Sequence, residues 1–489
     1  MPCTTVLVGK KASYDGSTMI ARNDDSGAGR FTPKKFAVIG PKEQPRIYKS
    51  VISRVEIELP DNPMRYTAVP NAVEGEGIWA ASGVNEANVG MTATETITSN
   101  PRVLGADPLV VYQPAKDGQP ERAGGIGEED IVCLVLPYIR SAREGVRRLG
   151  SLLERYGTYE MNGIAFQDAD EIWWLETIGG HHWMARRVPD EACVIMPNQL
   201  GIDRFDWEDA YGGQKEFMCA ASLREFTERN CLDLSRDGFS PRDAFGSHDD
   251  SDHVYNTPRA WSMGRYFCPK TFRWDGPEAD YTPLSDDIPW CLVPEKRVTA
   301  EDVKYVLSSH YQGTPYDPYL PHGDRSMSGA YRSIGINRND FFSLIQLRPG
   351  KDAVQWLAFA SNAFNAAVPL YTDVEEAPEY LANTTAEVST DNFYWVSRLI
   401  AAMADASYKK SLFHVEHYQE EVAAKSHALL NRYDGLLREE TDPAARQLLR
   451  REANREAAGM LKQAAARALD RVLYETSSQM KNAYSRSDA

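Results

Sequence analysis

The stretch CTTVLVGKKASYDGSTMIARNDD, residues 3–25, decides the fold that we expect for this chain. Residues 3–8 alternate as in a half-buried β-strand, and Tyr14-Asp15-Gly16 is a turn signal before a second short strand over residues 17–22. Such a hairpin returns Arg22 and Asp25 to the neighbourhood of Cys3. The stretch therefore brings a thiol, a guanidinium and a carboxylate together.

Cys3 is a candidate nucleophile because it lies almost at the amino terminus. A thiol attacks only as the thiolate, so it needs a nearby base or cation. An α-amine, with a pKa of roughly 7.7 to 8.0, can be that base, and it is tethered to the same residue. Arg22 would favour the thiolate, and Asp25 would hydrogen-bond and orient the amine. The alternative is an ordinary buried first strand beside a surface ion pair.

The residues of this opening resemble those of a known family. The resemblance lies in Cys3, in the segments Leu-Val-Gly-Lys-Lys-Ala-Ser and Asp-Gly-Ser-Thr-Met-Ile-Ala-Arg-Asn, and in the pair Arg22-x-x-Asp25. The opening is similar to the start of the bacterial cysteine dipeptidases of the dipeptidase A type. These are N-terminal-nucleophile hydrolases related to choloylglycine hydrolases and penicillin V acylases. The resemblance implies an α+β fold, a four-layer αββα sandwich, and cysteine-based amide hydrolysis with no cofactor and no metal.

The same resemblance suggests further site residues. Asn198 follows a predicted strand over residues 193–196 and matches the oxyanion-hole asparagine of the related acylases. Arg265 matches their additional active-site arginine, with Arg259 as its rival. Thr94 and Glu95 follow the hairpin that leads to the pocket in those acylases, so we expect them to line it; the alternative is an ordinary sheet edge.

Met1 and Pro2 depart from the pattern that the mechanism needs. An amine base must be free, yet removal of Met1 alone would leave Pro2 acylating the Cys3 nitrogen. We therefore predict that residues 1–2 are a removed pro-dipeptide, excised by autoprocessing.

Composition and charge exclude several classes of function. The 489 residues carry a net charge of −16, which argues against nucleic acid and anionic lipid as partners. No secretory signal or membrane-spanning run occurs, so we expect a cytoplasmic protein. Seven scattered cysteines without a C-x-x-C favour reduced thiols.

A zinc peptidase is disfavoured, because the sequence has no H-E-x-x-H. His181 and His182 are adjacent on a predicted strand, so they should point to opposite faces and not chelate one ion. His414 and His417, three apart on a predicted helix, could share a face, but packing or solvated roles are favoured.

We expect a catalytic core over residues 3–385 and a helical extension over residues 386–489. Within the core, residues 101–127 read as a long loop or lid, followed by helices at 128–136 and 142–156. From about residue 391 glycine nearly disappears and helical spacing persists to about 480, interrupted at Asp442-Pro443. We predict a helical hairpin packed on the core, which also offers a contact for a homo-oligomer.

The leading interpretation is a cysteine dipeptidase that acts on small peptides, mainly dipeptides. The first alternative keeps the chemistry and changes the substrate: an acylase of bile-salt, penicillin or acyl-lactone amides. An alternative of another class is a catalytically silent assembly protein in which Pro2 permanently blocks the amine.

Overall fold

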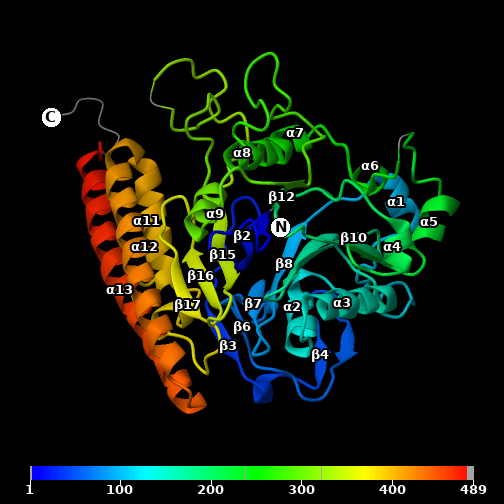
Figure 1. Ribbon diagram of the computed structural model, residues 1–489, viewed down its shortest axis with the longest axis horizontal. Helices are drawn as coiled ribbons and strands as arrows, with labels where there is room; N and C mark the ends of the chain where they lie inside the picture. Colours follow the sequence, from blue (N-terminus) through cyan, green and yellow to red (C-terminus); the bar gives the residue numbers. More distant parts are fainter. Residues whose placement is uncertain (1–2, 237, 321, 482–489) are drawn as a thin grey trace.

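The computed structural model describes residues 3–236, 238–320 and 322–481, except for the side chain of Thr94. The chain has an α+β fold in which two antiparallel sheets lie at the centre and long helices flank one side (Figure 1). The amino-terminal hairpin, coloured dark blue, lies near the middle of the molecule, whereas the carboxyl-terminal helices lie at its edge.

A seven-stranded sheet contains the amino-terminal hairpin. The hairpin strands pair antiparallel, with Thr5 opposite Arg22, and β2 pairs on its other side with β15. The predicted hairpin is therefore confirmed, and its second strand runs three residues further, to Asp25. In spatial order the strands are β14 (Cys291–Leu292), β12 (Cys193–Met196), β1 (Thr4–Val8), β2 (Thr18–Asp25), β15 (Asn339–Leu347), β16 (Val354–Phe359) and β17 (Val368–Tyr371).

A six-stranded sheet is built from the middle of the chain. Three of its strands follow one another between residues 162 and 187. In order they are β13 (Phe217–Cys219), β11 (His182–Arg187), β10 (Ile172–Ile178), β9 (Asn162–Gln167), β8 (Gly90–Thr96) and β7 (Ser82–Val84). Two short ribbons pair β3 (Ala37–Ile39) with β6 (Tyr66–Ala68), and β4 (Ile47–Lys49) with β5 (Glu56–Glu58).

The two sheets face each other. Thr5 Oγ1 donates to Glu95 Oε2 at 2.7 Å, and the hydroxyls of Ser82 and Ser343 lie 2.9 Å apart. Leu7 packs into the core between the sheets, while its neighbour Val6 packs into a second core on the opposite face. The expectation of a half-buried first strand was thus wrong: β1 is buried along its whole length because both of its faces are covered.

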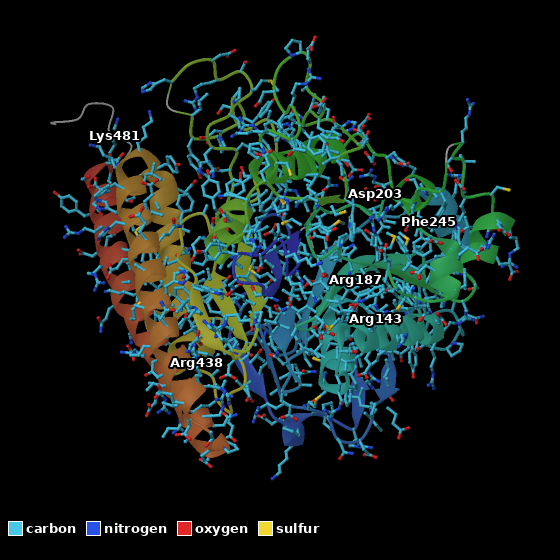
Figure 2. All side chains as sticks on the ribbon, in the orientation of Figure 1. Arg143, Arg187, Asp203, Phe245, Arg438 and Lys481 are labelled. Atoms are coloured by element: carbon cyan, nitrogen blue, oxygen red, sulfur yellow. The ribbon has the colours of Figure 1, made fainter. Side chains whose placement is uncertain are left out.

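The two helices predicted at residues 128–136 and 142–156 are α2 (Glu128–Val135) and α3 (Ala142–Tyr156), and both pack beside the six-stranded sheet. Two glycines let α3 approach: a Cβ at Gly145 would lie 2.4 Å from Phe166, and one at Gly150 would lie 2.3 Å from Trp183. Arg143 of α3 and Arg187 of β11 lie close together (Figure 2), and both bind the carboxylate of Glu171. Helix and sheet are therefore joined by close packing and by a shared ion pair.

The carboxyl-terminal region forms three helices, not the predicted hairpin: α11 (Phe393–Ala406), α12 (Tyr408–Glu439) and α13 (Pro443–Ser478). The additional break is at Ser407, which separates α11 from α12. The predicted interruption at Asp442-Pro443 is confirmed, because the Asp442 side chain caps α13 by accepting from Ala445 N.

The three helices pack on the seven-stranded sheet at β16 and β17 (Figure 1). Asn454 of α13 accepts from Tyr371 N at 2.8 Å and donates to Tyr371 O at 2.9 Å, as a neighbouring strand would. Asp434 of α12 binds Arg348 through two hydrogen bonds of 2.7 and 2.9 Å. The helices therefore cover the edge strand β17, whose backbone groups would otherwise lack partners.

The predicted loop over residues 101–127 begins with a short helix, α1 (Pro101–Ala106), which Asn100 caps, and continues without long regular structure. Among the described residues, no helix is both long enough and apolar enough to cross a membrane. The remaining helices are short: η1 (Pro41–Glu43), η2 (Leu136–Tyr138), α4 (Trp207–Tyr211), α5 (Leu223–Arg229), α6 (Pro241–Phe245), α7 (Asp252–Tyr255), α8 (Thr257–Phe267), α9 (Ala300–Leu307) and α10 (Glu379–Ala382).

Candidate active site

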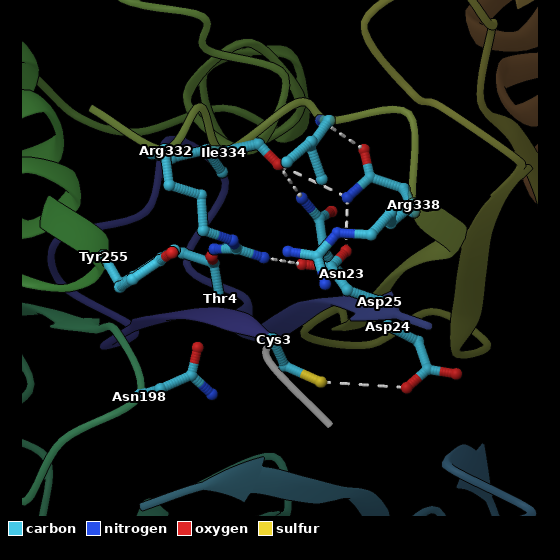
Figure 3. Close-up of polar contacts among 12 residues, drawn as sticks. Cys3, Thr4, Asn23, Asp24, Asp25, Asn198, Tyr255, Arg332, Ile334 and Arg338 are labelled. Carbon is cyan, nitrogen blue, oxygen red and sulfur yellow. Dashed lines mark hydrogen bonds and ion pairs between the residues drawn. The ribbon is translucent and has the colours of Figure 1, made fainter. Parts of the chain in front are cut away.

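Cys3 lies directly before β1, opposite the end of β2 (Figure 3). Arg22 Nη2 donates to Cys3 Sγ at 2.8 Å, and the thiol lies 3.7 Å from Asp24 Oδ1. Arg22 also binds Asp24 at 2.7 Å and Glu128 of α2 at 3.1 Å. The hairpin thus places the guanidinium against the sulfur, and α2 adds a carboxylate from the facing side of the site.

Cys3 Sγ, Asp24 and Glu128 could also be read as three ligands for a metal ion, since their ligand atoms lie within 4.8 Å of one another. All three surround one atom, Arg22 Nη2. A guanidinium nitrogen therefore stands where the three groups would place a cation, and their arrangement is explained by Arg22.

Burial and charge oppose each other at this cluster. Burial raises the pKa of the Cys3 thiol well above its usual value, although the positive charge of Arg22 lowers it. At Asp24 burial also acts to raise the pKa, but Lys34 and Arg22 outweigh it and hold the carboxyl below its usual range. Asp24 therefore stays ionised, whereas thiolate formation depends on Arg22 and on a base that takes the proton.

Asp25 lies on the other face of β2, because successive strand residues alternate. Its carboxylate accepts from Arg332 and from Asn339, on the side away from the thiol (Figure 3). The carboxylate beside the sulfur is therefore that of Asp24. The predicted contact between Asp25 and the free Cys3 amine stays a prediction.

Asn198 and Arg259 lie together on the other side of Cys3. Arg259, completely buried on α8, donates to the Cys3 carbonyl, to Thr4 Oγ1 at 2.6 Å and to Asn198 Oδ1 at 2.6 Å. The Asn198 amide donates one hydrogen to Thr96 O at 2.9 Å. Since an amide nitrogen carries two hydrogens, the second can serve a ligand at this position.

Of the two candidate arginines, the structure brings Arg259 and not Arg265 to Cys3. The Arg265 side chain is 37% exposed, binds Asp275 at 3.1 Å and lies over the Trp261 ring. Burial, and then the charge of Arg332, lower the pKa of Arg259 to about 9. Arg259 thus remains mostly charged at neutral pH and fixes the start of β1 relative to Asn198.

Glu95 of β8 reaches the site from the facing sheet through its bond to Thr5. Burial raises the pKa of Glu95 to about 7, against the opposing effects of Arg259 and of that hydrogen bond. The pairing of β8 with β9 is irregular between Ala93 and Glu95. The side chain of Thr94, the other expected pocket residue, lies outside the described residues.

The histidine expectations had different outcomes. His181 and His182 do not diverge: both Nδ1 atoms contact the Asp107 carboxylate, at 2.9 and 2.7 Å, because His181 still belongs to the turn before β11. His414 lies 3.6 Å from Glu475, whereas His417 stacks on the neighbouring Phe413. These contacts give both pairs a structural role.

The sequence reasoning missed several residues of the site. Glu128 was placed only at the start of the helix predicted over residues 128–136, and nothing local linked it to Cys3. The sequence reasoning chose Asp25 and not Asp24. The alternation of side chains along β2 could have shown that Asp24 lies on the same face as Arg22. The others come from distant segments without a local signal: Lys34, Asn256, Arg332 and Asn339.

Comparison with known proteins identifies the family to which this chain is similar. A family model described as peptidase family C69 matches residues 2–421. The chain is 54% identical to a dipeptidase of Bifidobacterium longum (strain NCC 2705) across the full length of both proteins. It is 51% identical to a probable dipeptidase A of Streptococcus pyogenes serotype M3, again over both full lengths, and 46% identical to dipeptidase A of Lactobacillus helveticus over 83% of this chain and 82% of the relative.

Proposed function

Because the chain belongs to peptidase family C69, we propose that it is a cysteine dipeptidase whose nucleophile is Cys3. The observation that carries the proposal is the contact of 2.8 Å between Arg22 Nη2 and Cys3 Sγ, within a buried cluster that also holds Asp24 and Glu128. A guanidinium at that distance favours the thiolate, the form in which sulfur attacks.

In the proposed reaction the thiolate attacks the carbonyl carbon of the dipeptide bond, and a carbon–sulfur bond forms. The thiol proton passes to the Cys3 α-amine, and the developing oxyanion accepts from Asn198 Nδ2. When the carbon–nitrogen bond breaks, the amine returns the proton to the leaving nitrogen. Water then hydrolyses the thioester and releases the amino-terminal residue of the dipeptide, with the amine again acting as base.

This mechanism requires a free Cys3 amine, so we propose that residues 1–2 are removed. Intact mass of the purified protein tests this step directly, since the active form should lack both residues. Full activity in a protein that retains Pro2 would refute the amine as base.

We also propose the arrangement of an N-terminal-nucleophile hydrolase: a four-layer αββα core over residues 3–385 and the helical extension over 386–489. The facing sheets support it, together with α2 and α3 beside the six-stranded sheet and α8 and α9 beside the seven-stranded one; α11 to α13 then form the extension.

The decisive test is the variant Cys3→Ala, which should lose dipeptide hydrolysis while its circular dichroism stays unchanged. Persisting hydrolysis would refute the assignment. Parallel assays with glycocholate and penicillin V separate a dipeptidase from an acylase, and activity retained in a chelator would argue against a metal-dependent peptidase.

A further inference from the structure

Several carboxylates lie around Cys3, and their partners differ. Asp24 is bound by Arg22 and by Lys34, whose Nζ lies 3.2 Å from Asp24 Oδ2. Asp25 is held by two other side chains, Arg332 and Asn339, and Glu128 is held by Arg22. The charges of these three carboxylates are therefore already engaged within the protein.

Glu95 differs from these carboxylates in that, among the described residues, no cationic side chain forms a hydrogen bond with it. Its Oε2 accepts from Thr5, a neutral hydroxyl, whereas its Oε1 is buried and has no hydrogen-bond partner among the residues that the structure describes. The whole residue is 1% exposed. A buried carboxylate oxygen without a donor is costly, so the site holds unused capacity for a donor, and a cationic donor satisfies it best.

The position of Glu95 suits one end of a dipeptide. Thr5 follows Cys3 by two residues on the same face of the strand, about 7 Å along it. In a dipeptide the amino nitrogen lies about 2.5 Å from the scissile carbonyl carbon. During attack, sulfur approaches the carbonyl carbon to about 3 Å, and an ionic hydrogen bond to the amine is about 2.8 Å long. These distances add to about 8 Å, so a carboxylate oxygen up to about 8 Å from Sγ can bind the amine during attack.

Electrostatics supports the same ligand. The charges of Arg259, Arg22 and Asp25 act on Glu95, and the charge of Glu95 acts in turn on Cys3, yet the pKa of Glu95 stays near 7 because burial outweighs the two cations. An ammonium that arrives next to Oε1 would compensate the buried negative charge and favour its ionised form.

We infer that Glu95 Oε1 binds the protonated α-amine of the first residue of the substrate, so that the site selects peptides with a free amino terminus. This inference rests on the proposed dipeptidase function and specifies its substrate class. It also gives a physical reason why amides whose acyl part lacks an ammonium, such as bile salts, would be poor substrates.

The test compares alanylalanine with propionylalanine, which has the same structure but lacks the amino group. The wild type should prefer alanylalanine by at least 100-fold in kcat/KM. Glu95→Gln should reduce that preference at least 30-fold, because kcat/KM falls for alanylalanine and stays unchanged for propionylalanine. Glu95→Asp should retain part of the preference. Glu56→Gln, at an exposed glutamate paired with Lys49, is the matched control and should behave like the wild type.

An unchanged preference in Glu95→Gln would overturn the inference, as would an equal loss on both substrates, since Glu95 would then act on Cys3 or on the oxyanion. Calorimetric binding to Cys3→Ala, prepared to begin at residue 3 because autoprocessing would need Cys3, tests the inference without turnover: adding Glu95→Gln should weaken alanylalanine binding at least 10-fold and leave propionylalanine binding unchanged. If the wild type hydrolyses neither compound, the proposed function fails. The binding result then still decides the role of Glu95.

Discussion

Replacing Arg22 with methionine should raise the pKa of the Cys3 thiol and slow its reactions. Arg22 Nη2 lies 2.8 Å from Sγ, and at an effective dielectric constant of about 20 two unit charges at that distance attract by about 6 kcal/mol, or about 4 pKa units. Part of this effect is offset, because Asp24, 3.7 Å from the thiol, would take up a proton once Arg22 is gone. We therefore expect a rise of about 2 to 4 units.

The assay is the rate at which an aromatic disulfide reagent modifies Cys3 in the mature protein at pH 7.5, located by peptide mass. A higher pKa lowers the fraction of thiolate, but the thiolate of a less acidic thiol is intrinsically more nucleophilic and offsets part of that loss. A rise of 2 to 4 pKa units should therefore slow the reaction by roughly 10- to 150-fold. Cys231 is exposed and provides the internal reference. Arg265→Met, at the exposed arginine of α8, is the matched control and should leave the Cys3 rate unchanged.

The variant Arg22→Met also removes a positive charge that compensates the buried negative charges of Asp24 and Glu128. This loss can cost about 3 to 5 kcal/mol of stability. Circular dichroism must therefore show that it is folded. Arg22→Lys provides a second measurement, because it keeps the charge and should slow the reaction less than Arg22→Met. If folded Arg22→Met reacts at Cys3 within twofold of the wild type, Arg22 does not activate the thiol and the reasoning fails.

Three further predictions follow from other contacts. Asn198→Ala should lower kcat by about 100- to 1,000-fold with little change in KM, because it removes a donor to the oxyanion; a change confined to KM would contradict this role. Burial raises the pKa of Glu176 to about 7, so the native state binds the extra proton between pH 4.5 and 7 and stability falls as pH rises through that range. Glu176→Gln should remove up to roughly 3 kcal/mol of this decline, measured by urea unfolding at pH 5 and pH 8; parallel curves for variant and wild type would count against it. Asn454→Ala should cost about 1 to 3 kcal/mol and speed hydrogen exchange at the Tyr371 amide, and unchanged exchange there would show that α13 does not protect the edge strand.

Local patterns predicted much of the fold. The hairpin of β1 and β2 joins neighbouring segments through a turn with its own signal, so the proximity of Cys3 and Arg22 followed from the sequence. Helix α3 was predicted at its observed bounds, since Ser141 caps one end and Gly157 ends the other. The break at Ser407 had no such signal, and three helices were therefore read as two.

Contacts between distant segments could not be predicted in this way. Glu128 meets Arg22 across 106 positions, and Arg332 meets Asp25 across 307. Arg259 and Arg265 share α8 at six residues' separation, so they project from different sides of the helix. Only the packing of α8 decides which of them reaches Cys3.

The sequence by itself determined the nucleophile candidate, its guanidinium partner and the strand pair that joins them, because hydrophobic alternation and turn chemistry act over a few residues. Tertiary structure alone decided which carboxylates neutralise Arg22, which arginine holds Asn198, and that Glu95 keeps an oxygen without a donor. Those outcomes depend on how the second sheet and α8 dock against β1 and β2, and docking is set by shape and burial summed over the whole core.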